Sequence, residues 1–95
     1  MEQLRNAGFA ITICDKDGKI LDMNARSKQT FAKYGDIIGH SLFEYHPPRA
    51  AEILRGLLEN HNVNAYTIEK EGLHKLIYQV PWFEENGDFG GYVEL

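Results

Sequence analysis

The chain has 95 residues, 43% of them hydrophobic and 12% aromatic, which is enough apolar material for one small domain with a single core. A formal net charge of −4 gives its surface no broad attraction for nucleic acid or anionic lipid. The N-terminus lacks the basic and long apolar segments of a signal peptide, and the one cysteine cannot form an internal disulfide. We therefore expect a soluble cytoplasmic domain that contacts neither nucleic acid nor a membrane.

The first predicted element is a strand over residues 9–15. Its larger apolar side chains fall at every second position, Phe9, Ile11 and Ile13. This period of two is typical of a strand with one face on a core. Asp17 and Gly18 follow, and Asp-Gly between two apolar runs predicts a hairpin turn. Residues 20–23 should then form the return strand.

The same turn also resembles the start of a calcium-binding loop, because Asp15 and Asp17 are spaced as its first two ligands would be. Such a loop needs a glycine at the sixth place and a carboxylate at the twelfth. Counted from Asp15, these places hold Ile20 and Arg26. The count favours a hairpin over a metal site.

Beyond the hairpin the pattern becomes helical. Asn24 is suited to cap a helix whose small and aromatic residues share a face, Ala25, Ser27, Phe31 and Tyr34. Short helical turns are expected around Gly35 and Gly39, and Pro48 begins a helix that ends near residue 60. Three strands follow, over residues 64–70, 73–83 and 89–95. Helices inserted between strands of an antiparallel sheet indicate an α+β fold with the helices on one sheet face.

No catalytic or metal-binding motif is present in the sequence. The four histidines, His40, His46, His61 and His74, do not show the short paired spacing of zinc ligands with one another or with Cys14. Cys14 lies near a strand end, where a thiol usually packs inertly. We therefore predict no catalytic residue and no metal site. Aromatic side chains either fill the core or line a cavity between sheet and helices.

Several short motifs, taken in order, resemble the PAS domain family of bacterial sensory modules. They are the turn Asp15-Lys-Asp-Gly-Lys-Ile20 followed by Asn24, the run Phe31-Ala-Lys-Tyr-Gly-Asp-Ile-Ile-Gly-His-Ser-Leu-Phe43, and the final Gly90-Gly-Tyr-Val-Glu-Leu95. The resemblance implies a five-stranded antiparallel sheet in the order 2-1-5-4-3. It also implies that Asn24 closes the hairpin onto the first helix, and that Ile38-Gly39 forms the turn beside a ligand cavity.

By this resemblance the domain binds a small ligand or a protein partner and transmits the change to an effector domain, in the same chain or a partner chain, as a homodimer. The candidate pocket residues are Asn24, Phe31, Tyr34, Ile38, Phe43, Leu54, Tyr66, Tyr78 and Trp82. Residues 1–8 are expected to be a lead-in helix fragment and residues 9–95 the sensory domain. The chain is interpreted either as a module of a longer signalling protein or as a standalone regulator.

The sequence departs from the cofactor-binding members of the family. Flavin-binding light sensors carry Asn-Cys-Arg-Phe on a helix, whereas the corresponding helix here begins Asn24-Ala25 and contains no cysteine. Haem-binding members place a histidine within the long helix, and residues 48–60 contain none. Flavin is therefore disfavoured and haem is not supported, although Cys14, His46 or His61 could serve as haem ligands. A small enzyme using His40, His61 or Cys14 is the remaining alternative.

Overall fold

A computed structural model describes the backbone of residues 2–95 and all of their side chains except that of Lys70. In chain order the elements are α1 (Glu2–Arg5), β1 (Thr12–Asp15), β2 (Ile20–Met23), α2 (Ala25–Thr30), the 3₁₀ helices η1 (Ala32–Tyr34) and η2 (Leu42–Tyr45), α3 (Pro48–Asn60), β3 (Asn64–Lys70), β4 (Leu73–Phe83) and β5 (Phe89–Glu94). No helix in the part of the chain described is long and apolar enough to cross a membrane.

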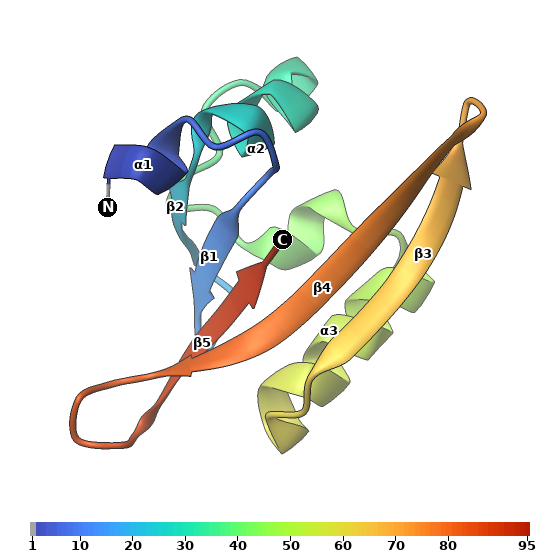
Figure 1. Cartoon of the computed structure of the whole chain (residues 1–95). Coiled ribbons are helices and arrows are strands. Elements are labelled where there is room, and N and C mark those ends of the chain that lie inside the picture. The colour runs from blue at the N-terminus through green and yellow to red at the C-terminus, as the bar shows by residue number, and fades with distance from the viewer. Residues whose placement is uncertain (1) are drawn as a thin grey trace.

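The five strands form one antiparallel sheet in the order β2-β1-β5-β4-β3. Figure 1 shows α3 behind the sheet, with β3 and β4 nearer to the viewer than the helix. One face is therefore covered by α3 and η2, and we call the other, which is turned toward the viewer, the open face. The α+β class and the predicted strand order are confirmed.

The core lies between the covered face and the helices. Its buried members are Cys14, Ile20, Met23, Ile37, Leu42, Leu54, Leu57 and Tyr92. The hydroxyl of Tyr92 lies 2.8 Å from the carbonyl oxygen of Leu57 and 2.6 Å from that of Asn62, and donates its one proton to either. This contact joins the end of α3 to the central strand β5.

Local turn chemistry accounts for the hairpin ends. The Asp15 carboxylate accepts hydrogen bonds from the backbone N–H groups of Asp17 and Lys19, each at 2.9 Å. The turn between β3 and β4 has positive φ at both Glu71 (53°) and Gly72 (78°), as a two-residue hairpin loop requires. The hairpin interpretation of the first turn is confirmed, and the Asp15 side chain serves the turn itself.

The first strand differs from its prediction in length and in orientation. It begins at Thr12 rather than Phe9, because the backbone groups of Phe9 and Ile11 bond to Asn24. Within the strand, Thr12 and Cys14 face the core, while Ile13 is half-buried on the open face and Phe9 is exposed. Of the three side chains predicted to face the core, Ile11 is buried, and the prediction was wrong for Phe9 and Ile13.

The helix that Asn24 caps, α2, is also shorter than expected. α2 ends at Thr30, and the chain continues as a 3₁₀ turn over Ala32–Tyr34. Ser27 is buried, Phe31 is half-buried and Tyr34 is exposed. The predicted helical face therefore ends with α2, because Phe31 is the cap that follows it and Tyr34 lies on the 3₁₀ turn.

Candidate functional site

Asn24 is the polar centre of the junction between α1, β1 and α2. Its Oδ1 accepts hydrogen bonds from the backbone N–H groups of Ile11 (2.9 Å) and Ser27 (3.0 Å). Its Nδ2 donates to the carbonyl oxygens of Leu4 (2.9 Å) and Phe9 (2.8 Å). All four side-chain bonds are made by one buried residue, and the predicted cap of the first helix is confirmed.

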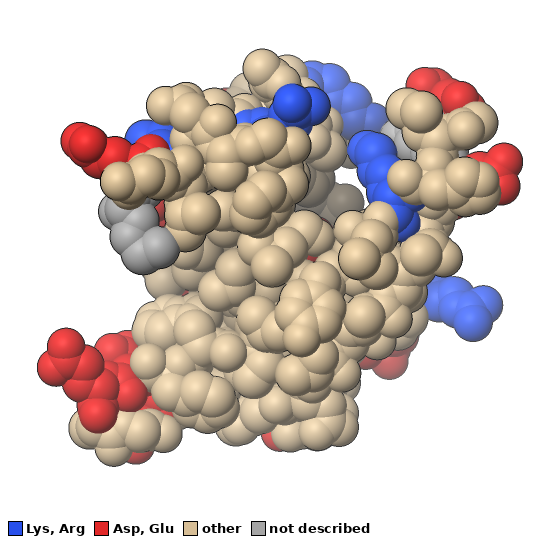
Figure 2. Space-filling view, in the orientation of Figure 1, with Lys and Arg blue, Asp and Glu red and all other residues tan. Residues whose placement is uncertain are grey.

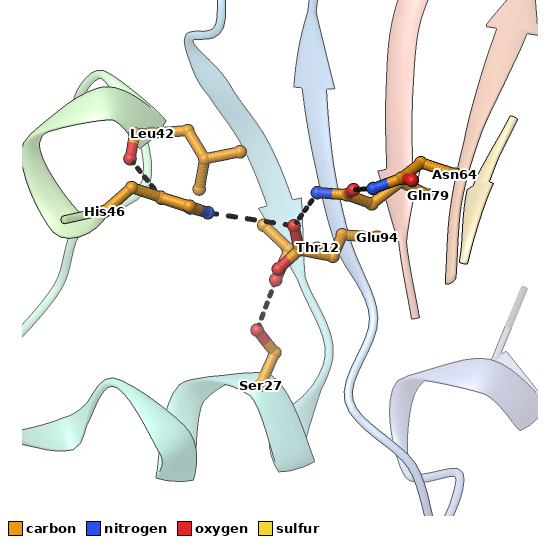
Figure 3. A network of polar contacts seen from close by, with 7 residues as sticks. All are labelled: Thr12, Ser27, Leu42, His46, Asn64, Gln79 and Glu94. Atoms are coloured by element: carbon orange, nitrogen blue, oxygen red, sulfur yellow. Dashed lines mark hydrogen bonds and ion pairs between the residues drawn. The ribbon is translucent and has the colours of Figure 1, made fainter. Parts of the chain in front are cut away.

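A chain of polar side chains crosses the covered face of the sheet from η2 to the edge strand β3 (Figure 3). Asn64 Nδ2 donates to Gln79 Oε1 at 2.8 Å, and Gln79 Nε2 donates to Glu94 Oε2 at 2.8 Å. The same carboxylate oxygen lies 3.8 Å from His46 Nε2. We call these four residues the polar chain; it ties three strands to the segment that enters α3.

Strand pairing explains why these side chains meet. Gln79 lies directly opposite Asn64 on one side and Glu94 on the other. Residues directly opposite one another in an antiparallel pair point to the same face, so all three line up in a row across the sheet. Beside this row, Thr12 Oγ1 and Ser27 Oγ lie 2.6 Å apart and join β1 to α2.

The hydrogen bonds of His46 determine its chemistry. Its Nδ1 lies 2.8 Å from the carbonyl oxygen of Leu42, and because a carbonyl only accepts, Nδ1 carries a proton. Nε2 is then the nitrogen that gains or loses a proton. The facing Glu94 carboxylate raises the pKa of His46 above its ordinary value, against the opposing effect of burial.

Glu94 is the buried charge of this group. Burial by itself would raise its pKa, but the side chains of His46 and Gln79 bring the pKa of Glu94 below its ordinary value. The two charged side chains are 11% and 18% exposed, so solvent screens their attraction only in part. The polar chain can therefore hold or release one proton at His46 Nε2 next to a carboxylate that stays ionised.

Trp82 forms a second link, on the open face. Its indole Nε1 donates to the carbonyl oxygen of Cys14 at 2.9 Å, so the ring reaches across β5 to β1. A Cβ at Gly90 would overlap the Trp82 ring, and a Cβ at Gly91 would overlap the Cys14 carbonyl oxygen. The two glycines allow the indole and β1 to approach the backbone of β5 closely.

The predicted pocket residues are found in several places. Three lie on the helix side of the sheet: Leu54 is in the core, Phe43 packs against Gly18, and Tyr66 is half-buried on the covered face. Alternation along β4 puts Tyr78 and Trp82 on the open face with Val80, because Gln79 points to the covered face. Which of them touch a ligand stays a prediction.

The remaining predicted residues lie near the surface around the first helices. The rings of Phe31 and Tyr34 form an aromatic cluster with Tyr45, with ring centroids 6.4 Å apart for Phe31–Tyr45 and 4.9 Å apart for Tyr34–Tyr45. Ile38 borders an open hollow of about 280 Å³. Asn24 borders another, of about 210 Å³, beside α1.

The residues considered for catalysis or haem ligation do not form a site together. Burial raises the pKa of the Cys14 thiol to about 11, so at neutral pH it is not the thiolate that attacks or ligates. The His61 ring is stacked on Phe89 with 3.6 Å between centroids, and exposed His40 pairs with Glu44. His46 uses Nδ1 on Leu42 and turns Nε2 to Glu94, so these residues do not fit a haem.

The sequence suggested a turn, cap or surface position for His46, or a role as a metal or haem ligand, and did not place it beside Glu94 in the polar chain. Among the described residues, no group of three or more His, Cys, Asp or Glu side chains could hold a metal ion. The sequence does contain one signal for the contact between Asn64 and Gln79. Counting back from the two-residue turn at Glu71-Gly72 pairs Asn64 with Gln79.

Comparison with known proteins agrees with this architecture, although no curated protein sequence matches the chain. The PAS domain of histidine kinase ThkA has 21% identity and a TM-score of 0.71, covering 88% of this chain and 92% of its own. A PAS domain from Colwellia psychrerythraea has 23% identity and a TM-score of 0.70, covering 98% and 87%. The Aer2 receptor from Vibrio cholerae, described as a dual PAS-heme oxygen sensor, has 14% identity and a TM-score of 0.64, covering 90% and 88%.

These solved structures show the fold, since all three are less than 25% identical to the chain. A family model described as the PAS fold matches residues 4–95, which is nearly the whole sequence. The match includes the Asn24 junction, the polar chain and the glycine pair of β5. The chain belongs to the PAS-fold family.

Proposed function

We propose that this domain is a sensory signalling module that associates through the open face of its sheet and transmits a change of state to an effector domain. The partner that we propose for the open face is a second copy of the chain. The observation that carries the proposal is the apolar character of the open face. Buried, unpaired Cys14 is compatible with the reducing bacterial cytoplasm in which we place the protein.

The open face has apolar side chains on three adjacent strands, β1, β5 and β4. Ile13, Val93 and Val80 lie opposite one another in a row across β1, β5 and β4. Leu76 and Tyr78 extend this surface along β4, and they are 68% and 38% exposed. Figure 2 shows the same side of the molecule, where the centre is free of charged side chains and Lys, Arg, Asp and Glu lie toward the margins.

An uncharged apolar surface of this kind favours association, because burial removes apolar area from water at about 25 cal/mol per Å². A two-fold dimer needs one self-complementary patch, and a row of branched aliphatic side chains on a sheet supplies it without matching charges. The surface includes Val93, which is next to Glu94 of the polar chain. A change at the covered face can thus reach the association surface through β5.

The substitution Leu76→Glu is expected to weaken self-association about tenfold or more, because it places a charge in the interface and removes an apolar side chain worth about 1.5–3 kcal/mol when buried. Sedimentation equilibrium over a range of protein concentrations measures the dissociation constant. Leu73→Glu is the matched control. Leu73 lies on the same hairpin and is 65% exposed, but strand alternation points it away from the open face.

The association proposal fails if wild-type protein stays monomeric at millimolar concentration. It also fails if Leu73→Glu weakens association as much as Leu76→Glu does. Native mass spectrometry of freshly purified protein adds the identity of any co-purified small molecule, which would name the ligand side of the same function.

A further inference from the structure

The contact between His46 and Glu94 joins two parts of the fold that are far apart in the sequence, the segment before α3 and the strand β5. His46 follows η2 directly and precedes α3, while Glu94 is the last residue of β5. Their side chains meet on the covered face, 3.8 Å apart between Nε2 and Oε2 (Figure 3). The entry to α3 and the C-terminal strand are therefore joined across this pair.

The contact has two states that differ by one proton. With Nε2 protonated, an imidazolium faces a carboxylate, and the pair attracts. With Nε2 neutral, Nδ1 keeps its proton and donates it to the Leu42 carbonyl oxygen, so the lone pair of Nε2 faces the Glu94 oxygen. That oxygen keeps its hydrogen bond from Gln79 and has no donor toward η2. Loss of the proton removes the attraction without offering a replacement.

The other groups around the pair come from β1, β3, η2 and α3. Cys14 on β1 and Tyr66 on β3 lie near enough to feel Glu94, and burial raises the pKa of both, so they stay neutral at neutral pH. Glu44 of η2 is exposed and lies next to His40. On α3, Arg55 lies over the Phe43 ring and donates a hydrogen bond to the Glu52 carboxylate. Thr12, Ser27, Gln79 and Asn64 are uncharged.

We propose that the His46–Glu94 contact is a proton-controlled latch, closed in mildly acidic conditions and open in mildly alkaline ones, which makes the proton a signal that this domain detects. In the closed state η2 and the start of α3 are held to β5. In the open state this segment separates from Glu94, while Gln79, the Tyr92 hydroxyl and the core continue to hold β5 on the covered face. The same strand carries Val93 on the open face, so the latch acts on the proposed association surface.

The direction of the pH effect on stability follows from the pKa shifts of His46 and Glu94. The raised pKa of His46 means that the latch is complete below the ordinary histidine value of 6.5 and is lost as pH rises through the higher folded value. The lowered pKa of Glu94 means that its contribution is present above 4.5 and is lost as pH falls through the lower folded value. Stability from the latch is therefore greatest between about pH 4.5 and 6.5.

An NMR titration of the histidine rings and backbone amides from pH 5 to 9 tests the latch. We expect His46 to titrate with a midpoint above 6.5, and the amides of Tyr45, His46 and Glu94 to shift with that midpoint. Glu94→Gln should lower the His46 midpoint and remove the coupled amide shifts. Glu44→Gln is the matched control, since it removes the partner of exposed His40 in the same manner and should leave His46 unchanged.

The titration is run in the Leu76→Glu variant as well as in the wild type, so that its outcome is independent of association. A His46 midpoint at or below 6.5 would overturn the latch, as would a midpoint that Glu94→Gln leaves in place. Should Glu94→Gln unfold the domain, the wild-type titration still decides, because amides of η2 and β5 that do not move with the His46 midpoint contradict the proposal.

Discussion

Replacing Gly91 with alanine is expected to lower the free energy of unfolding by about 3 kcal/mol, the upper end of the usual cost of overpacking. The added Cβ would overlap the Cys14 carbonyl oxygen and lie 2.7 Å from the Asp15 carbonyl carbon. Both atoms are backbone of β1, so no side-chain rotation relieves the clash. The β1–β5 pairing must separate, and it lies at the centre of the sheet.

Urea denaturation of the variant measures this loss, which corresponds to a fall in melting temperature of roughly 15 °C for a domain of this size. Gly56→Ala is the control. Gly56 is inside α3, where an added Cβ meets nothing within 4 Å, and alanine there should stabilise the domain by about 0.5–1 kcal/mol. A Gly91→Ala variant as stable as the wild type would show that β1 and β5 are not as close as described.

Asn24→Ala is expected to cost about 3 kcal/mol, since loss of a helix cap alone costs about 1 kcal/mol and each buried group left unpaired costs 1–3 kcal/mol. The change removes two acceptor contacts, to the N–H groups of Ile11 and Ser27, and two donor contacts, to Leu4 and Phe9. These contacts hold α1 as well as α2. Amide exchange should accelerate in α2 and in the lead-in segment together.

The same substitution at Asn60 provides a comparison. Asn60 is exposed and accepts one hydrogen bond, from the Asn62 N–H at 2.8 Å, so its replacement should change stability by less than about 0.5 kcal/mol. Equal effects at the two asparagines would mean that Asn24 acts only as an ordinary local cap. Faster exchange in α2 with α1 unchanged would lead to the same conclusion.

Local signals predicted most of the fold. The Asp17-Gly18 turn, the proline at the start of α3 and the Glu71-Gly72 turn are short-range features, and the element ends that they mark agree with the structure. The resemblance to the PAS family supplied the strand order, which short-range signals do not contain. A strand order depends on which segments pair, and pairing is a property of the whole chain.

The faces of β1 show where local pattern was insufficient. A four-residue strand with Ile13 on one side and Cys14 on the other has apolar side chains at both parities. Period-two alternation separates the two faces but does not say which one meets the helices. The prediction assigned the larger side chain, Ile13, to the core, whereas the structure places Ile13 on the open face and Cys14 in the core. This same departure is what leaves an apolar surface available for a partner.

The polar chain could be predicted only in part. The pairing of Asn64 with Gln79 follows from the two-residue turn between their strands. The pairing of Gln79 with Glu94 depends on the longer β4–β5 connection and on a register shift between Trp82 and Phe83, neither of which the sequence specifies. His46 reaches Glu94 only because η2 packs on the covered face. A long-range contact of this kind has no signature in residue spacing.

The most direct test of the account is an isotope-filtered NOE measurement on a mixture of labelled and unlabelled chains, which detects only contacts between copies. We expect intermolecular contacts among Ile13, Leu76, Tyr78, Val80 and Val93, and none that involve the outer surface of α3. Intermolecular contacts confined to α3 or to the Phe31–Tyr34–Tyr45 aromatic cluster would contradict it, because they would show that the open face is not the surface through which this domain associates.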